Sequence, residues 1–562
     1  MTEPEPDHDR APLESLRRAV LATAQELAGG AHADGRTPIT LERPRRAQFG
    51  DYSTNAALLL APAMGVPPRE LAQRLGSALQ QRLGASVERF EVAGPGFVNL
   101  FVSDTWLTGA LAQALSAGER FGARGARARE RVLIEFVSAN PTGPMHVGHA
   151  RNAAYGDALA RMLALQGHRV EREFYVNDAG SQVRKLGESI QALARGQAVP
   201  EDGYKGEYVV DLVARLANAS SMDPSELGRA AVAVVVGQLA ASLQDFRVSF
   251  DSWVYESRLH EGDPSPVAHT LAILERQGHT YRQEGALWLR TTDFGDDKDR
   301  VLVRSSGEHT YFASDIAYHQ DKRERGFERQ IDVWGADHHG YVRRMKAAYE
   351  ALGGDPAELE LLIMQLVHLV SSGERAQMSK RSGEFVTLDE LVAEIGVDAA
   401  RWYLLARSHD TTVDLDLDLA REQSSENDVY YVQYAHARIA SMLAKAGGER
   451  VAAASAATIG AAAALATGAG REPLHPTERA LVEQLLAFPA ELDEAADRRA
   501  PHRMAAYALA LAQTFTAFYR DCHVVGAEPE AVESLRIALC VASGRTIARC
   551  LDLLGVSAPA KM

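Results

Sequence analysis

The segment from Val132 to Val176 constrains the fold most strongly, because two strand patterns flank a helix pattern. VLIEFV (132–137) is a short apolar run, ARNAAYGDALARMLALQ (150–166) has the apolar periodicity of a helix, and VEREFYV (170–176) again has a strand pattern. A right-handed crossover between parallel strands places the loop after the first strand at the carboxyl edge of the sheet. Open α/β sheets bind ligands at this edge. The loop at 138–149 is therefore where the sequence predicts a site.

Further patterns divide the chain into three parts. Strand-like runs at 331–337 and 361–367 extend the sheet, and residues 180–300, first helical and then rich in Gly and Asp, have the character of an insertion. A chain of 562 residues is too long for one core. We expect an N-terminal domain, a catalytic domain with the insertion at about 180–300, and a helical C-terminal domain, at residues 1–120, 121–397 and 398–562. The Ala-rich stretch at 452–470 is expected to be a helix end followed by a connection.

Charge and cysteine content narrow the functional classes. The net charge of −15 gives no support for nonspecific adhesion to nucleic acid, although a basic stripe on an acidic body could still bind RNA. Cys522, Cys540 and Cys550 match neither a zinc ribbon nor a redox pair, which favours buried thiols in a reducing compartment. No signal-peptide pattern or long uninterrupted apolar run is present. We therefore expect a cytoplasmic protein that does not enter a membrane.

The sharpest chemical signal is His146-Val-Gly148-His149, at the junction of the first strand and its helix. Imidazoles three residues apart share one face of a helical turn, and the helix N-terminus offers N–H groups to a nucleotide phosphate. Gly148 lets a flat ligand approach the backbone. A lone histidine pair is more often ordinary structure, and a zinc site would need a third ligand. A P-loop is excluded because His149 stands where that motif has Lys.

A second signal follows the last strand pattern, in the segment QMSKRSG at 377–383. Two cations beside hydroxyls and a glycine suit a loop that closes on a triphosphate, with Lys380 as a point charge. Alone, such a segment is more often a solvated turn. Together with the His-Val-Gly-His loop in one doubly wound sheet, the segment becomes a specific signal for nucleotide binding.

Together the two signals resemble the class I aminoacyl-tRNA synthetases, and longer strings resemble the arginyl-tRNA synthetases. These strings are EFVSANPTGPMHVGHARNAAYGDAL (135–159), FYVNDAGSQ (174–182), GDDKDRVLVRSSGEHTYFASDIAYH (295–319), VWGADHHGYVRR (333–344) and YYVQYAHARI (430–439). FGDYSTN and GPGFVN likewise resemble that family's N-terminal domain. The resemblance implies an α/β fold: a doubly wound parallel-sheet, Rossmann-like catalytic domain with an N-terminal α+β domain and a C-terminal helical bundle.

The resemblance also implies a two-step reaction, in which ATP with Mg²⁺ activates L-arginine and the arginyl group passes to the 2′-hydroxyl of the terminal adenosine of tRNA(Arg). His146, His149 and Lys380 would be catalytic, and Gly148, Met378 and Ser379 would join them in binding ATP. The residues implied for arginine are Glu135, Asn140, Tyr311, Asp315 and His338, and those for tRNA are Tyr430, Tyr434 and Arg438. The family default is a monomer, and no metal bound by protein side chains is expected.

Some features depart from the family pattern or admit other interpretations. Gln377 and Arg381 replace the first Lys and the last Ser of the usual Lys-Met-Ser-Lys-Ser, and the Asp-Ala-Leu-Arg motif is here 398–401, Asp-Ala-Ala-Arg. The segment at 337–340, Asp-His-His-Gly, could suggest a metal, but its position favours substrate contacts. Alternating aspartates at 414–418 are interpreted as a solvated face. A small-molecule nucleotidyltransferase would not need the flanking domains, and a binding-only relative would not need the intact His146, His149 and Lys380.

Overall fold

The structure is a computed structural model, which describes residues 12–29, 38–44, 46–123, 129–375, 386–464 and 473–562. Its centre is a five-stranded parallel sheet in the order β12-β11-β5-β6-β7. The strands are β5 (Arg131–Glu135), β6 (Arg169–Val176), β7 (Ser252–Tyr255), β11 (Arg329–Gly335) and β12 (Leu359–Met364). The crossover helix α5 (Val147–Leu165) follows β5. The chain winds outward from β5 in one direction and returns on its other side at β11, so the β5/β11 boundary is the topological switch point where such sheets bind ligands.

Two insertions interrupt this sheet, and strand β7 separates them. Between β6 and β7 lie the helices α6 (Ser181–Ala194), α7 (Glu207–Arg215) and α8 (Pro224–Asp245). Between β7 and α10 (Tyr311–Glu324) lie α9 (Pro266–Arg276) and an antiparallel sheet of β8 (Thr280–Gln283), β9 (Ala286–Leu289) and β10 (Arg300–Val303). The sequence predicted one insertion over 180–300 and missed β7, because a four-residue strand carries too short an alternation to register.

Helix α8 is the one element of the described chain that is long and apolar enough, by length and composition, to span a membrane. Its apolar residues are partly buried in the protein, and Leu227, Ala231 and Leu239 are covered almost completely. Gly187 of α6 and Gly228 of α8 let the two helices approach closely, since a Cβ on either would collide with backbone of the other. The helix therefore packs here as a core helix of the insertion.

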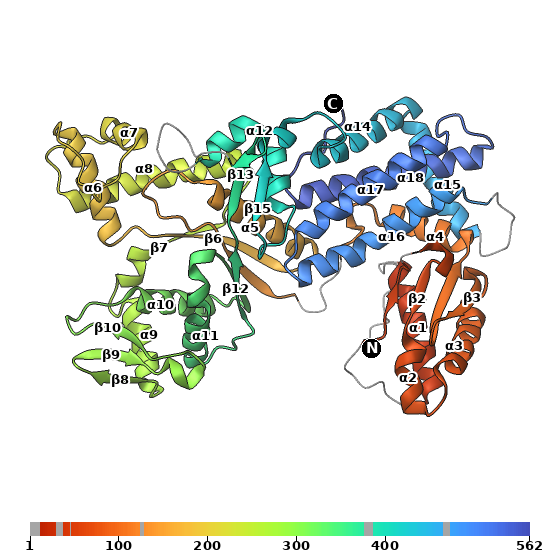
Figure 1. The fold of residues 1–562 in the computed structure, drawn as a ribbon, viewed down its shortest axis with the longest axis horizontal. Coiled ribbons are helices and arrows are strands. Elements are labelled where there is room, and N and C mark those ends of the chain that lie inside the picture. Colours follow the sequence, from red (N-terminus) through yellow and green to blue (C-terminus); the bar gives the residue numbers. More distant parts are fainter. Residues whose placement is uncertain (1–11, 30–37, 45, 124–128, 376–385, 465–472) are drawn as a thin grey trace.

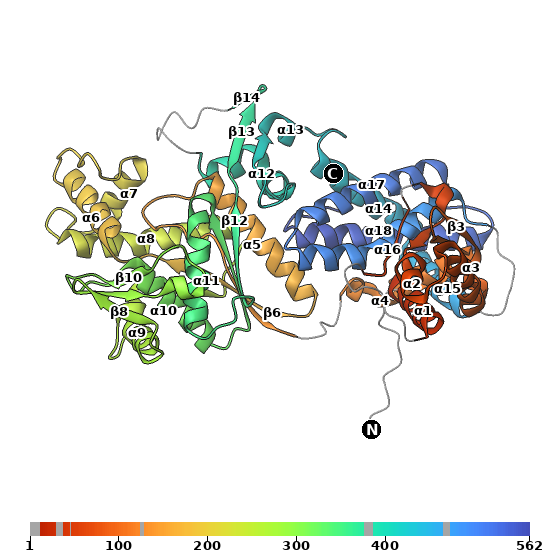
Figure 2. The same ribbon diagram turned by 60° about the horizontal axis from the view of Figure 1, so that its bottom comes forward.

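The N-terminal module is an α+β unit. Its antiparallel sheet has the order β1-β2-β4-β3 and is covered by helices. The elements are α1 (Pro12–Ala28), β1 (Leu41–Glu42), β2 (Tyr52–Thr54), α2 (Ala56–Met64), α3 (Pro68–Leu83), β3 (Val87–Ala93), β4 (Phe97–Val102) and α4 (Asp104–Ala117). Figures 1 and 2 show this module beside the C-terminal helices, at the end of the molecule opposite α6 and α7. Arg479 joins the two, because its guanidinium donates to Asp51 (2.6 Å) and Asp104 (2.7 Å).

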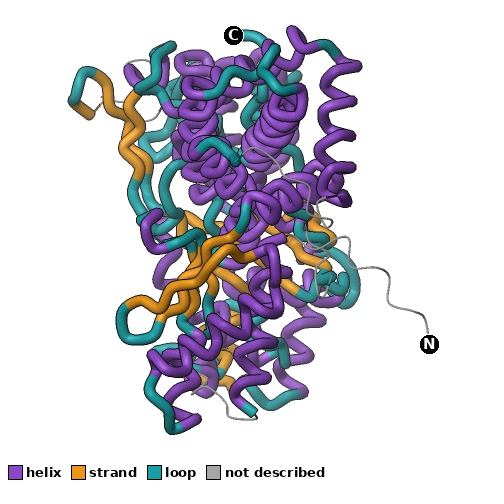
Figure 3. Tube along the Cα trace, turned by 90° about the vertical axis from the view of Figure 1, so that its right-hand side faces the viewer, coloured by secondary structure: helices purple, strands orange, loops and turns teal. Residues whose placement is uncertain are grey.

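The C-terminal part is mainly helical, and in the side view of Figure 3 helices fill the upper part of the molecule, near the labelled C-terminus. Its helices are α12 (Leu388–Leu405), α13 (Leu417–Arg421), α14 (Asp428–Ala446), α15 (Gly448–Ala464), α16 (Pro476–Asp497), α17 (His502–Asp521) and α18 (Glu530–Leu553). Helix α11 (Val342–Ala351) lies between β11 and β12 in the chain. Most of the Ala-rich stretch at 452–470 is thus helix α15, and its last residues lie outside the described chain.

A small three-stranded sheet corrects two predictions. Its order is β14-β13-β15, from β14 (Glu374–Arg375), β13 (Val367–Ser371) and β15 (Val413–Asp416). Residues 398–562 were expected to be helical, but they also contribute the strand β15, which pairs with β13 in parallel. The aspartates at 414–418 are also more than a solvated face: Asp416 caps α13, and Asp418 accepts a hydrogen bond from the backbone N–H of Ser372 at 2.6 Å.

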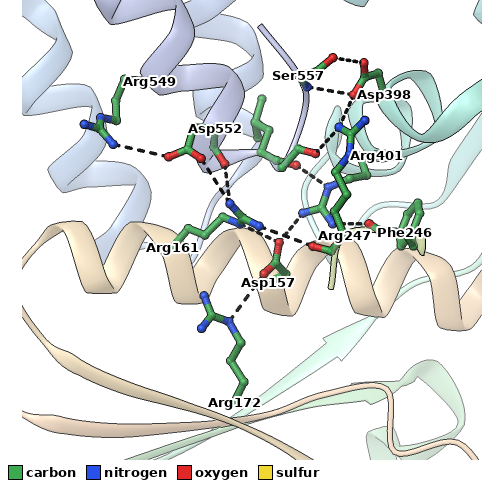
Figure 4. A network of polar contacts seen from close by, with 12 residues as sticks. Asp157, Arg161, Arg172, Phe246, Arg247, Asp398, Arg401, Arg549, Asp552 and Ser557 are labelled. Atoms are coloured by element: carbon green, nitrogen blue, oxygen red, sulfur yellow. Dashed lines mark hydrogen bonds and ion pairs between the residues drawn. The ribbon is translucent and has the colours of Figure 1, made fainter. Parts of the chain in front are cut away.

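A buried arginine joins the catalytic helix, an insertion and the C-terminal part. The guanidinium of Arg401 donates to the Asp157 carboxylate on α5 (2.6 Å), to the Phe246 carbonyl after α8 (3.0 Å) and to the Leu554 carbonyl after α18 (2.8 Å). Figure 4 shows Arg161 and Arg172 approaching the same carboxylate, and Asp398 holding Ser557 near the chain end. The Asp-Ala-Ala-Arg motif is therefore a structural junction.

Candidate active site

The two histidines of the predicted nucleotide loop form one stacked unit at the start of α5. Their ring centroids are 3.7 Å apart, His146 Nδ1 accepts from the Gly148 N–H at 3.1 Å, and His149 Nδ1 accepts from the His146 N–H at 3.3 Å. Burial lowers the pKa of both, to about 3 for His149, where His146 also contributes. Both rings are therefore neutral near pH 7. Since Nδ1 accepts in each, the ring proton lies on Nε2, which can donate to a ligand.

The local structure explains why position 148 is a glycine, and the sequence alone did not reveal this reason. A Cβ at this position would lie 2.9 Å from the ring of His146. The absence of a side chain therefore allows His146 to fold back over the first turn of α5 and cap it.

The loop before α5 pairs directly with the segment that follows the Met-Ser-Lys motif. Val147 N–H donates to Val386 O (3.1 Å), and Leu388 N–H donates to Met145 O (2.9 Å). Met378, Ser379 and Lys380 themselves lie outside the described residues. The segment Val386–Leu388, which follows Lys380 by six to eight residues, is hydrogen-bonded to the histidine loop.

An acidic cluster of Asp178, Glu256 and Asp315 lies at the ends of β6 and β7 and the start of α10. Asp315 on α10 accepts a hydrogen bond from the Tyr341 hydroxyl at 2.5 Å, and burial raises its pKa. Glu256, the first residue of the 3₁₀ helix η4 (Glu256–His260), is only 5% exposed. Burial raises the pKa of Glu256 to about 7, and the negative charges of Asp315 and Asp178 contribute. Both charges that act on Glu256 are thus negative, so the acidic cluster suits a cationic partner.

The other residues predicted for arginine occupy different depths. Tyr311 is 58% exposed and lies one turn before Asp315, with its hydroxyl near Gly180. His338 is exposed and partly opposes the rise in the pKa of Asp315, which places it near the acidic cluster. Asn140 is exposed in the loop after β5. These three are available to a ligand from solvent.

Glu135 differs from these three residues because it is buried, at the end of β5. It is 7% exposed, and its carboxylate accepts from Lys322 Nζ at 2.7 Å and from Ser138 Oγ at 2.8 Å. The backbone just after it is strained, since Val137 and Ser138 have φ values of 68° and 39°. Asn152 of α5 holds this turn by accepting from the Val137 N–H at 2.8 Å. Strain held by neighbours in this way is frequent at functional sites.

Three side chains in this region were not singled out from the sequence: Glu256, Lys322 and Asn152. Glu256 follows the short strand β7, and Lys322 lies in the charged run DKRE, which is typical of a solvated helix face. Only Asn152 had a usable signal, because it stands in the string that carried the family resemblance. Their roles depend on neighbours that are distant in sequence.

Comparison with known proteins identifies the family. The family models "Arginyl tRNA synthetase N terminal domain", "tRNA synthetases class I (R), catalytic domain" and "DALR anticodon binding domain" match residues 14–102, 110–202 with 232–440, and 432–562. The arginine–tRNA ligases of Carboxydothermus hydrogenoformans and Bacillus subtilis are each 42% identical, over 98% of both chains. The chain belongs to the arginyl-tRNA synthetase family. The solved arginyl-tRNA synthetase of Thermus thermophilus is 26% identical, with a TM-score of 0.76 over 98% of this chain and 100% of that one.

In this member of the arginyl-tRNA synthetase family, α14 carries an exposed aromatic surface. The rings of Tyr430 and Tyr434 are nearly parallel, with centroids 6.1 Å apart. Arg438 lies over Tyr434 (4.7 Å) and over Tyr519 of α17 (5.0 Å), and Tyr434 is 42% exposed. Tyr519 is an addition to the predicted set. Alternating aromatic and guanidinium planes of this kind suit stacking on unpaired bases.

The described part of the chain has no cluster of side chains suited to bind a metal ion. No three His, Cys, Asp or Glu side chains lie together there as a ligand set. In the segment at 337–340, His338 lies 3.5 Å from Asp337, and both are exposed.

Proposed function

We propose that this chain is an arginine–tRNA ligase that forms arginyl-adenylate from arginine and ATP and transfers the arginyl group to the 2′-hydroxyl of the terminal adenosine of tRNA(Arg). The observation that carries the proposal is that one α/β domain holds both the acidic cluster of Asp315 and Glu256 and the stacked pair His146 and His149. Carboxylates for a guanidinium, together with neutral hydrogen-bond donors for a phosphate, are what joining arginine to a nucleotide requires.

In the activation step, the arginine carboxylate attacks the α-phosphorus of ATP, and pyrophosphate leaves. The Nε2–H groups of His146 and His149 donate to oxygens that gain negative charge in the transition state. Gly148, Met378 and Ser379 belong to the same nucleotide site, and Lys380 holds the leaving pyrophosphate. Mg²⁺ enters with ATP as part of the substrate complex and neutralises phosphate charge.

Substrate choice is assigned to the acidic cluster. The planar guanidinium gives two parallel N–H bonds to Asp315, and Glu256 receives a further N–H from the same group. Tyr311 covers the acidic cluster from the solvent side. At the other end of the amino acid, Glu135 receives the α-ammonium, while Asn140 and His338 border the carboxylate and the ribose. Lysine, with a compact ammonium, cannot satisfy both carboxylates in this geometry.

The flanking domains are assigned to tRNA. The N-terminal domain (1–120) and the helical domain (398–562) reach different parts of the tRNA from the catalytic domain (121–397). Tyr430, Tyr434 and Arg438, together with Tyr519, are proposed to stack on unpaired anticodon-loop bases. We further propose that the protein acts as a cytoplasmic monomer without a membrane, which light scattering and cell fractionation would test.

The test is aminoacylation of total tRNA with each amino acid in turn. Arginine alone should be incorporated, and charging should require ATP. Pyrophosphate exchange into ATP, measured with and without tRNA, then separates activation from transfer. Charging with lysine at a comparable rate, or no charging with arginine, would contradict the proposal.

A further inference from the structure

A buried lysine contacts Glu135, the residue proposed above to receive the α-ammonium of arginine. Lys322 of α10 has an exposed fraction of 0%, and its Nζ is 2.7 Å from Glu135 Oε2 and 2.8 Å from Asp332 Oδ1. Glu135 and Asp332 are opposite one another on the adjacent strands β5 and β11. The ammonium thus bridges the two strands at the switch point of the sheet.

The network around Lys322 extends to His319. His319 lies with Nδ1 2.7 Å from the Asp315 carbonyl oxygen and Nε2 2.7 Å from Asp332 Oδ2. Asp332 therefore contacts both Lys322 and His319. Consistently, Lys322 and His319 outweigh burial and lower the pKa of Asp332 to about 2.

We propose that Lys322 is a positioning residue for arginine, which keeps Glu135 ionised and oriented so that its remaining lone pairs receive the α-ammonium of the substrate. This inference rests on the proposed function, in which Glu135 binds that ammonium. Glu135 has room for the contact, because a carboxylate accepts about four hydrogen bonds and, among the described residues, Lys322 and Ser138 are its side-chain donors.

Lys322 acts only through its neighbours. Two of its donors are taken by Glu135 and Asp332, and its Nζ lies 4.2 Å from the centroid of the Tyr318 ring. With no exposed surface, it cannot touch arginine itself. Its effect on substrate binding must therefore pass through the ionisation and orientation of Glu135.

Because burial and Lys322 act on the pKa of Glu135 in opposite directions, removing Lys322 should make arginine affinity depend on pH. Burial raises the pKa of Glu135, nearby Asp332 raises it further, and Lys322 opposes both. The titratable groups that face Glu135 from the surrounding elements are Lys322, Asp332, Tyr175 and Tyr318. Without the ammonium, Glu135 would hold its proton to higher pH. The lost affinity should then return in part as pH rises.

The experiment compares two ligands on the full chain carrying Lys322→Met. Arginine and 5-guanidinopentanoate differ only in the α-amino group, so calorimetric titration of both isolates the contact with Glu135. At pH 7 we expect Lys322→Met to weaken arginine binding about 10-fold or more, and binding of the analogue less than about 2-fold. The arginine deficit should shrink at pH 9. Lys346→Met is the matched control, because the hydrogen bond of Lys346 of α11 within the described residues goes to the Pro356 carbonyl, and it should change neither affinity.

A double variant keeps the test informative if Lys322→Met does not fold. Glu135→Gln with Lys322→Met removes the unpaired charge, and it should bind arginine as Glu135→Gln alone does. Equal weakening of both ligands by Lys322→Met, a deficit that does not change with pH, or a further loss in the double variant would overturn the inference. Failure of the wild-type chain to bind arginine at all would instead refute the proposed function.

Discussion

Arginine binding should strengthen as pH rises through neutrality, because Glu256, which we propose binds the guanidinium, keeps much of its proton up to about pH 7. The pKa of Glu256 is raised from 4.5 to about 7, by burial first and then by Asp315 and Asp178. A guanidinium requires the ionised form, so the binding-competent fraction is about one tenth at pH 6 and about nine tenths at pH 8. The apparent Kd for arginine should therefore fall about 10-fold between these values.

The same shift predicts how stability depends on pH. A carboxyl group whose pKa is raised on folding stabilises the protein below its unfolded pKa, and this contribution is lost as pH rises through the folded pKa. For Glu256 the window is pH 4.5 to 7, and the loss is about 3 kcal/mol. Bound arginine should offset the loss, so the rise in Tm that arginine causes should be larger at pH 8 than at pH 6.

The assay is isothermal titration calorimetry at pH 6, 7 and 8, in buffers with different ionisation enthalpies. Near pH 7, binding should release about half a proton from Glu256. Glu256→Gln is the direct control, since a glutamine cannot titrate, and its affinity should vary much less over the same range. An affinity that is flat in the wild type, or an unchanged pH slope in Glu256→Gln, would refute the reasoning.

Three further predictions concern the other parts of the site. His149→Ala should lower kcat for charging by about 10²- to 10³-fold with little change in the KM for arginine, because the neutral Nε2–H acts on the transition state; an unchanged kcat would contradict it. Asp315→Asn should reduce kcat/KM for arginine by at least about 2 kcal/mol, with ATP binding retained; a lowered Tm with normal kinetics would mean a structural role. Tyr434→Ala should weaken tRNA binding by about 1 to 3 kcal/mol, which would raise the KM for tRNA. An unaltered KM would exclude stacking by this residue.

Local patterns in the sequence predicted the parts of the site that depend on neighbours close in the chain. The spacing of His146 and His149 predicted a shared face, and the two rings do stack. The family resemblance implied both Tyr311 and Asp315 for arginine, and both lie on the first turns of α10. The strand–helix–strand unit was equally readable, because it combines short apolar runs with a long periodic helix.

Features that depend on distant partners could not be predicted in the same way. Glu256 is recognisable only after β7 has brought it beside Asp315, which is 59 positions later in the chain. Lys322 has the sequence context of an exposed cation, and its burial follows from its pairing with Glu135 and Asp332. The strand β15 was missed because alternating Asp and Leu also suits a solvated segment, and only its pairing with β13 distinguishes the two.

The buried junction at Arg401 has a consequence for how the protein unfolds. Its three acceptors come from α5, the end of α8 and the end of α18, and none of its surface is exposed. Moving the C-terminal helices away from α5 would break the hydrogen bond to Leu554 and expose a buried guanidinium–carboxylate pair, and losing such contacts costs several kcal/mol. The catalytic sheet and the C-terminal helices therefore cannot unfold independently of each other. Their melting is coupled, and heat should unfold the catalytic sheet and the C-terminal helices in one cooperative calorimetric transition.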